Sequence, residues 1–125
     1  FGAGAMAFFN ANLIPGTETI LKWVDFAAKA KKADWIITGE GCLDDTSFQG
    51  KLISGICKDA KEANTKVAVI AGRVNCNGSA LNEAVIAVAE ACAPSMIPDD
   101  IAFAHSEELL REAVNRVAER IAADL

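Results

Sequence analysis

Asp34-Trp-Ile-Ile-Thr38 and Lys66-Val-Ala-Val-Ile-Ala71 are the two apolar runs that decide the fold of this chain. Each run is short and leads into glycine, which is typical of strands buried on both faces of a parallel sheet. Between them, apolar residues recur at helical spacing over residues 48–62, with Thr46 or Ser47 placed to cap the helix. The order strand, glycine-rich loop, helix, strand predicts one βαβ unit.

The segments on either side of this unit continue the alternation of helices and strands. Residues 2–11 are apolar nearly all round, which predicts a helix packed deep against other elements, and the spacing predicts a second helix over residues 18–31. A short helix near residues 80–84, a third strand over residues 85–89 and a final amphipathic helix capped by Ser106 complete the pattern. The chain is therefore predicted to be an α/β domain with a mainly parallel sheet.

The composition is that of an ordinary folded domain. The 125 residues are 52% hydrophobic and 23% charged, which excludes a disordered or fibrous chain and predicts a single domain, residues 1–125. The net charge is −5 and the Lys and Arg residues are scattered, which argues against nucleic acid and anionic membranes as partners. Apolar runs fall far short of the roughly 20 residues of a membrane helix, so we expect a soluble, cytoplasmic protein. Because the chain starts at Phe1 rather than Met, we expect either a trimmed chain or a segment of something longer.

The four cysteines are expected to remain reduced thiols. They lie far apart, without a C-x-x-C pair or clustered histidines to complete a zinc site: Cys42, Cys57, Cys76 and Cys92. A domain of this size with an ample apolar core does not need disulfides. Each cysteine except Cys42 is predicted to be a small buried hydrophobe.

The glycine-rich loop after the first strand carries the candidate chemistry. In open parallel sheets, ligands gather beyond the carboxyl ends of the strands, where residues 38–45 are expected to lie. Glu40, Asp44 and Asp45 would place three carboxylates in one short loop, and their mutual repulsion needs a compensating group. Mg²⁺ held partly through water, beside phosphate oxygens, would supply it. Capping of the following helix by Asp44 or Asp45 is the alternative interpretation.

Two basic residues follow glycines near the same edge of the predicted sheet. Lys51 lies at the opening of a helix, where backbone N–H groups and a basic side chain can together hold an anion. Arg73 carries a planar guanidinium that could reach a carboxylate or phosphate, and an ordinary surface arginine is the alternative. His105 is expected to face solvent and not to act as a base, and Trp23 and Trp35 are expected in the core.

These residues resemble a known family. Thr38-Gly-Glu-Gly-Cys-Leu-Asp44, followed by Gly50-Lys51 and by Val69-Ile-Ala-Gly-Arg-Val74, is similar to the bacterial glycerate kinase family. Leu13-Ile-Pro-Gly16 and the closing amphipathic helix resemble the carboxy-terminal region of the same family, so the resemblance covers nearly the whole chain. It implies a flavodoxin-like or Rossmann-like three-layer α/β domain with a parallel sheet, as the carboxy-terminal part of a larger two-domain enzyme.

The resemblance also assigns roles to individual positions. Glu40, Asp44 and Lys51 match the acidic residues and the lysine of the family's loop, and they are the expected catalytic residues. The residues expected to bind substrate or phosphate are Gly39, Gly41, Gly50 and Arg73. Asp44 would also contact a metal ion through water. Two positions depart from the family, since Cys42 stands where Arg is usual and Thr46 where Gln is usual. A thiol cannot replace the bidentate grip of a guanidinium on a carboxylate or phosphate.

The function implied by the resemblance is the phosphorylation of glycerate by ATP with Mg²⁺. The active-site cleft would lie between two domains, so catalysis would also need the amino-terminal portion of the same enzyme, and the isolated chain would be inactive. Two alternatives stay open. One is a free-standing module that binds a small anion without chemistry. The other is a fragment that forms a homodimer, because its apolar first helix would otherwise face water.

Overall fold

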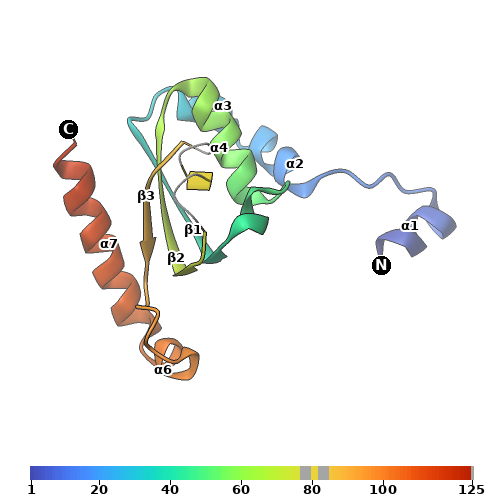
Figure 1. Cartoon of the computed structure of the whole chain (residues 1–125). Helices are drawn as coiled ribbons and strands as arrows, with labels where there is room; N and C mark the ends of the chain where they lie inside the picture. The colour runs from blue at the N-terminus through green and yellow to red at the C-terminus, as the bar shows by residue number, and fades with distance from the viewer. Residues whose placement is uncertain (77–79, 82–84, 125) are drawn as a thin grey trace.

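The protein is described by a computed structural model that covers residues 1–76, 80–81 and 85–124. Its centre is a sheet of three parallel strands in the order β1-β2-β3 (Figure 1). The strands are β1 (Trp35–Leu43), β2 (Lys66–Val74) and β3 (Ile86–Ala91). The three predicted strands and the βαβ unit are thereby confirmed. The predicted short helix near residues 80–84 falls largely outside the described residues.

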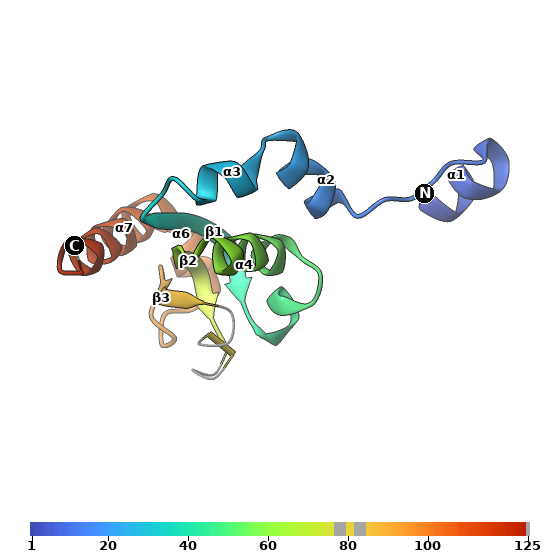
Figure 2. The same ribbon diagram turned by 90° about the horizontal axis from the view of Figure 1, so that it is seen from above.

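Helices cover both faces of the sheet, as Figure 2 shows from above. α4 (Leu52–Ala63) packs on one face and α7 (Ser106–Ala122) on the other. Side chains of β2 alternate between the two layers, because successive residues of a strand point to opposite faces. Val69 lies in the core beneath α4, and the next residue, Ile70, lies in the core beneath α7. The fold is therefore a three-layer α/β domain with a parallel sheet, as predicted.

β1 and β2 run further than the sequence pattern predicts. The two strands remain paired as far as Leu43 and Val74, so the predicted loop over residues 38–45 is wrong up to Leu43. The physical reason is a close approach of two glycines. A Cβ on Gly72 would lie 2.6 Å from the carbonyl oxygen of Gly41, so glycine at position 72 lets the strands pair to their ends.

The predicted helix over residues 18–31 is divided into two, α2 (Gly16–Trp23) and α3 (Phe26–Ala30). Asp25 between them has a φ of 51°, and this left-handed conformation interrupts the helix. Trp23 at the end of α2 is 78% exposed, so its predicted place in the core is wrong. Trp35 does pack against the core beneath α7.

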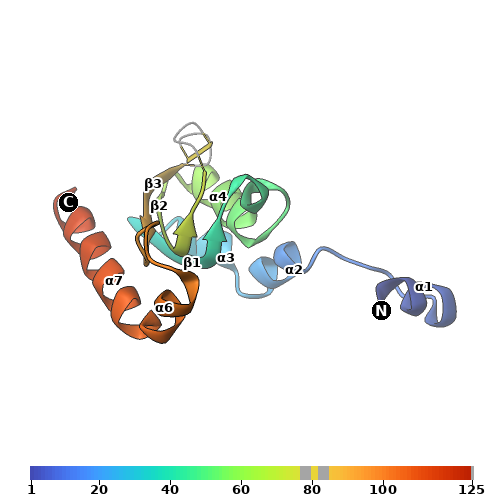
Figure 3. The same ribbon diagram turned by 60° about the horizontal axis from the view of Figure 1, so that its bottom comes forward.

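α1 (Gly2–Phe9) forms where a helix is predicted, but it lies apart from the sheet (Figure 3). All its residues are exposed or half-buried, and Phe8 and Phe9 are more than 80% exposed. The prediction that this helix packs deep against other elements is therefore wrong within the described chain. The reason is that residues 10–15 carry it away from the layers formed by the other helices.

The carboxy-terminal region contains a helix that the pattern did not predict, α6 (Asp99–Ala104). Its signals were Pro98 at the N-cap and two acidic residues in the first turn, which complement the helix dipole. α7 follows directly, with His105 at the N-cap, so the predicted capping role of Ser106 is wrong by one position. The His105 side chain is 61% exposed, as predicted. In the part of the chain that the structure describes, no helix has the length and apolar character to span a membrane.

The four cysteines are free thiols, as predicted. Cys57 lies on the buried face of α4, and burial raises the pKa of its thiol to about 11. Cys76 and Cys92 are half-buried, so for these two the prediction of full burial is wrong.

Candidate active site

The chain turns sharply where β1 ends, and Asp44 organises this turn. Asp44 is the N-cap of a single 3₁₀ turn, η1 (Asp45–Phe48). Its Oδ1 accepts hydrogen bonds from the backbone N–H of Thr46 at 2.8 Å and from the Thr46 hydroxyl at 2.7 Å. The Asp44 N–H donates to Ser47 Oγ at 3.2 Å, which completes a capping box. Asp44 therefore caps η1, and the predicted capping of the next helix by Thr46 or Ser47 is wrong, because α4 begins only at Leu52.

Lys51 precedes α4 and reaches back to the same turn. Gly50 has a φ of 70°, a left-handed conformation that directs the chain from η1 into α4. The Nζ of Lys51 donates a hydrogen bond to Thr46 Oγ1 at 2.5 Å. Asp44, Thr46 and Lys51 thus form one hydrogen-bonded chain, which we call the Asp44–Lys51 bridge.

The bridge favours the charged form of Asp44. The hydroxyl and then the backbone N–H of Thr46 hold the pKa of the Asp44 carboxyl below its usual value, and the positive charge of Lys51 lowers it further. Asp44 is therefore an ionised acceptor at neutral pH. It can orient a hydroxyl group or contact a cation.

Two thiols lie beside the bridge at the carboxyl ends of β1 and β2. The Sγ of Cys42 accepts a hydrogen bond from Asn75 Nδ2 at 3.6 Å. Burial raises the pKa of the Cys76 thiol, and the carboxylates of Asp45 and Asp44 raise it further. The Cys76 thiol is therefore neutral near pH 7, and Cys42 brings a weak polar contact but no positive charge to the site.

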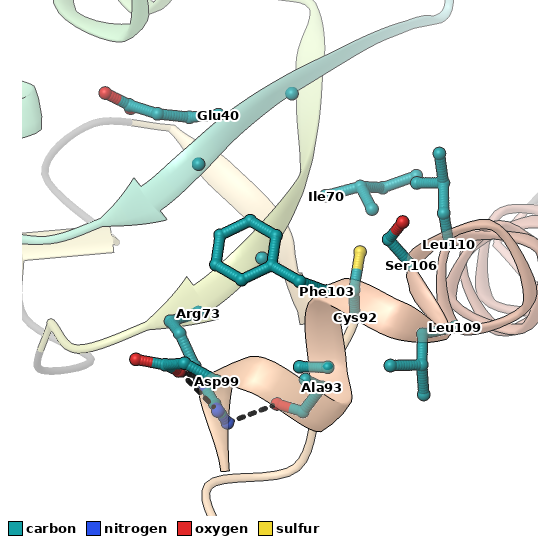
Figure 4. A pocket seen from close by; sticks show the side chains of 14 residues that line it. Glu40, Ile70, Arg73, Cys92, Ala93, Asp99, Phe103, Ser106, Leu109 and Leu110 are labelled. Atoms are coloured by element: carbon teal, nitrogen blue, oxygen red, sulfur yellow. Dashed lines mark hydrogen bonds and ion pairs between the residues drawn. The ribbon is translucent and has the colours of Figure 1, made fainter. Parts of the chain in front are cut away.

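Glu40 lies within β1 and not in a loop. Its register partner is Ala71, and its carboxylate points away from Arg73 (Figure 4). Its Oε2 is buried and has no hydrogen-bond partner among the described residues. These residues also contain no group of three or more His, Cys, Asp or Glu side chains that could hold a metal ion. The predicted gathering of Glu40, Asp44 and Asp45 in one loop is therefore wrong, because the glycine-rich segment continues as a strand.

A pocket of about 510 Å³ opens on the α7 face of the sheet (Figure 4). Its floor includes three glycines, Gly39, Gly41 and Gly72, at the ends of β1 and β2. Phe103 and Leu109 are among the apolar side chains that line it. Because these glycines leave part of the floor without side chains and part of the wall is apolar, the pocket suits a group with a flat or apolar face.

Gly50 and Lys51 line a different groove, of about 590 Å³, between α2 and α4. The structure therefore separates the residues predicted for one site. The α7-face pocket is lined by Gly39, Glu40, Gly41 and Arg73. Of the predicted site residues, the bridge brings together only Asp44 and Lys51, and Thr46 joins them. The sequence pattern singled out Thr46 only as a helix cap and as a departure from the family.

Arg73 is engaged by its own chain. Nη2 and Nε donate to Asp99 Oδ1 at 2.8 and 3.3 Å, and the side chain is only 22% exposed. Its other donors go to three backbone carbonyls, those of Ala93, Pro94 and Ile97. The guanidinium therefore ties the end of β2 to the segment that leads into α6. Its donors are used within the chain, so the alternative of an ordinary surface arginine is wrong, and its contact with phosphate stays a prediction.

A local signal could have identified the role of Thr46 in advance. In Asp44-Asp-Thr-Ser47, a capping residue is followed three positions later by a hydroxyl that can bond back to it. This spacing predicts a turn closed on Asp44, with Thr46 inside it. The Asn75 contact to Cys42 had no such signal, because the two residues are 33 positions apart.

Comparison with known proteins agrees with this architecture. The glycerate kinase family matches residues 1–122. The chain is 37% identical to glycerate kinase of Halalkalibacterium halodurans over 117 residues, which are 94% of this chain and 31% of that protein. It is 30% identical to glycerate kinase of Bacillus subtilis strain 168 over 96% of this chain, again 31% of that protein.

A solved structure shows the same relationship. A glycerate kinase 2 chain from Salmonella typhimurium LT2 superposes with a TM-score of 0.54 at 27% identity, covering 99% of this chain and 31% of that one. The chain therefore spans about 31% of the length of the relatives it matches. Given the family match over nearly all its residues, this chain belongs to the glycerate kinase family.

Proposed function

We propose that this chain supplies the carboxy-terminal part of the active-site cleft of an ATP-dependent glycerate kinase. The reaction would move the γ-phosphoryl group of ATP to a hydroxyl of glycerate and form phosphoglycerate. The observation that carries the proposal is the Asp44–Lys51 bridge beyond the carboxyl end of β1, in a member of the glycerate kinase family. A carboxylate and an ammonium group held beside the start of a helix suit a reaction between two anions.

In this proposal, Lys51 stabilises negative charge. An ammonium group has three donors, and Thr46 accepts one of them. The others, together with the N–H groups in the first turn of α4, would hold a phosphate or the carboxylate of the substrate. Asp44 would orient the reacting hydroxyl and accept its proton. Phosphoryl transfer depends mainly on such positioning and charge stabilisation.

The remaining candidates have supporting roles in this proposal. Gly39, Gly41 and Gly50 would let the backbone approach substrate closely, since they carry no Cβ. Glu40 is a second acidic candidate, because a buried carboxylate oxygen without a partner is uncommon and can receive a hydrogen bond from a ligand. Arg73 would act by holding the segment before α6 in place, through the contacts it makes with its own chain.

ATP and Mg²⁺ are the cofactors that the proposal requires. Mg²⁺ is usually bound through one or two carboxylates together with phosphate oxygens and water. Asp44 fits this donor set as a solvent-accessible carboxylate, and the described residues form no larger protein cage for a metal. The residues present therefore fit an ion that the nucleotide carries and that Asp44 contacts through water. When bound, such an ion neutralises charge on the phosphate oxygens.

The proposal also requires the amino-terminal portion of the same protein, because the chain spans about 31% of the length of its relatives. That portion would complete the cleft and cover the exposed side chains of α1, and the 125 residues alone would be inactive. A homodimer through α1 is the alternative, and sedimentation of the complete protein distinguishes the two. For a reaction that consumes ATP and acts on a small organic acid, we expect the cytoplasm as the compartment.

The test uses Asp44→Asn and Lys51→Ala in the complete protein. Each should lower kcat/KM by about 100-fold or more, because each removes a charge that acts on the transition state. Glycerate-dependent release of ADP gives the rate, and ³¹P NMR identifies the product. Asp34→Asn, at the amino end of β1, and Lys61→Ala, in the last turn of α4, are matched controls that should keep normal rates. Near-normal turnover in both site variants would overturn the proposal.

A module that binds a small anion without chemistry is the second candidate. The observation in its favour is Cys42, which places a thiol hydrogen-bonded by Asn75 where the resembled family usually has a cation. Calorimetry with glycerate and with phosphate separates the two functions. Binding that Lys51→Ala abolishes, with no release of ADP by the unmodified complete protein, would support the module and exclude the kinase.

A further inference from the structure

We propose that Thr46 is a positioning residue that holds Lys51 close to Asp44 but out of direct contact with it. The inference rests on the proposed function, because it concerns how the Asp44–Lys51 bridge would serve phosphoryl transfer. The hydroxyl of Thr46 uses its hydrogen and a lone pair at the same time. It donates to Asp44 Oδ1 at 2.7 Å and accepts from Lys51 Nζ at 2.5 Å. The backbone N–H of Thr46 donates to the same Oδ1 at 2.8 Å.

The hydroxyl acts as a spacer between two opposite charges. Within the described chain, the ion pairs closer than 4.0 Å do not include Asp44 with Lys51. In a direct ion pair, the Asp44 carboxylate would neutralise the Lys51 ammonium, because the attraction between two opposite charges grows as their separation shrinks. With Thr46 between them, the ammonium keeps donors for an anionic ligand and the carboxylate keeps its charge.

The neighbouring hydroxyl shows what a structural role looks like. Ser47 is completely buried, accepts from the Asp44 N–H and donates to the carbonyl of Cys42 at 3.3 Å. It therefore joins the end of β1 to η1. Thr46 is exposed, and its hydroxyl contacts only the two charged side chains of the bridge among the described residues. The two consecutive hydroxyls thus have different roles. That of Ser47 stabilises the fold, and that of Thr46 positions two charged side chains.

The kinetic test compares Thr46→Val, which removes the hydroxyl and keeps the shape, with Thr46→Ser, which restores it. In the complete protein, Thr46→Val should lower kcat by about tenfold, with little change in KM or in the unfolding temperature. Thr46→Ser should return kcat to near the original value. Thr19→Val is the matched control, since the Thr19 hydroxyl bonds only to the carbonyl of Pro15 in the described structure, and it should keep normal kcat. Ser47→Ala should lower the unfolding temperature instead.

Two kinetic results would overturn the inference. One is a Thr46→Val protein with unchanged kcat. The other is a Thr46→Ser protein as slow as Thr46→Val, since the methyl group and not the hydroxyl would then be what matters.

A crystal structure of the Thr46→Val protein tests the same inference without activity. We expect Lys51 Nζ to move onto the Asp44 carboxylate and form a direct ion pair within 4 Å, the distance at which such pairs are counted. A Lys51 side chain that keeps its original position would overturn the spacer role. If the unmodified protein releases no ADP with glycerate, the proposed function fails, and the crystal structure still decides the role of Thr46.

Discussion

Lys51 and Arg73 lie near the same edge of the sheet, each directly after a glycine, yet the fold uses their charges in opposite ways. Lys51 is exposed and its ammonium donates to a single hydroxyl, that of Thr46. Arg73 is 22% exposed and its guanidinium bonds to Asp99 and to three backbone carbonyls. One basic residue is left available for a ligand, and the other is consumed by the chain. Residue type and position in the pattern are therefore not enough to separate a binding residue from a structural one.

The difference follows from what surrounds each residue. The segment between β3 and α6 presents carbonyl oxygens close to the end of β2, and a guanidinium with five donors can satisfy several of them. Lys51 stands at the start of α4, where the first turn of the helix presents N–H groups and not acceptors. Lys51 therefore faces solvent, and the N-terminus of α4 adds positive potential around it.

The largest effect predicted from this comparison is a loss of stability in the Arg73→Ala variant. The substitution leaves carbonyls of the β3–α6 segment without donors, so the free energy of unfolding should fall by about 2–3 kcal/mol. Lys51→Ala should change it by less than about 0.5 kcal/mol. Urea unfolding followed by tryptophan fluorescence measures both, because Trp35 packs against the core beneath α7.

A control separates the carbonyl contacts of Arg73 from its ion pair. Asp99 is 79% exposed at its side chain, so Asp99→Asn should cost less than about 1 kcal/mol. If Asp99→Asn destabilised the chain as much as Arg73→Ala, the ion pair with Asp99, and not the carbonyls, would hold Arg73. Arg73 and Lys51 would then differ only in whether their charge is paired with a carboxylate.

An intermediate effect is expected for Gly50→Ala, which acts on the Lys51 side of the comparison. Gly50 has a φ of 70°, and a Cβ in the left-handed region costs about 1–2 kcal/mol. The same substitution should also lower turnover of the complete protein, because it shifts Lys51 away from Thr46. For stability, Gly41→Ala is the matched control, since a Cβ there would meet nothing within 4 Å. Equal stability of the two alanine variants would show that the turn does not depend on glycine.

The smallest expected effect is a dependence of stability on pH around Asp44. The bonds from Thr46 and the charge of Lys51 hold the pKa of Asp44 below its ordinary value of 3.8. A carboxyl with a lowered pKa stabilises the fold above its unfolded pKa and loses this contribution as pH falls through its folded pKa. The difference in urea midpoint between the original chain and Asp44→Asn should be constant near neutral pH and shrink below 3.8. A difference that grew on acidification would contradict the bridge.

Much of the fold could be predicted from local pattern. The apolar runs around Ile36 and Val69 predicted buried parallel strands, and the stripe in α7 predicted an amphipathic helix on the sheet. The residues of the bridge were also foreseen in part, since Asp44 and Lys51 follow from the resemblance and from their place beyond a strand. Thr46 appeared only as a possible cap of the next helix and as a departure from the family. Its link between Asp44 and Lys51 depends on how η1 folds back.

Where prediction failed, the cause was a contact distant in sequence. Glycines at positions 39 and 41 are typical of a loop, and the pairing of β1 with β2 made them a strand. Trp23 is typical of a core residue, and its side chain meets no covering element within the described chain. The apolar character of α1 predicted burial in the same way, and burial depends on a neighbour that local pattern does not contain.

By itself, the sequence determined the three strands and the helices α4 and α7 that cover them, because hydrophobic alternation and capping act over a few residues. It did not predict α6 or the break between α2 and α3. It also determined which charged and glycine residues stand at the carboxyl edge of the sheet. Only the tertiary structure decided which of these charges remain available. Arg73 meets its acceptors 20 to 26 positions away, whereas Lys51 finds Thr46 five positions back. The number of hydrogen-bond partners that packing brings to a charged group decides whether it stabilises the fold or stays available for a ligand.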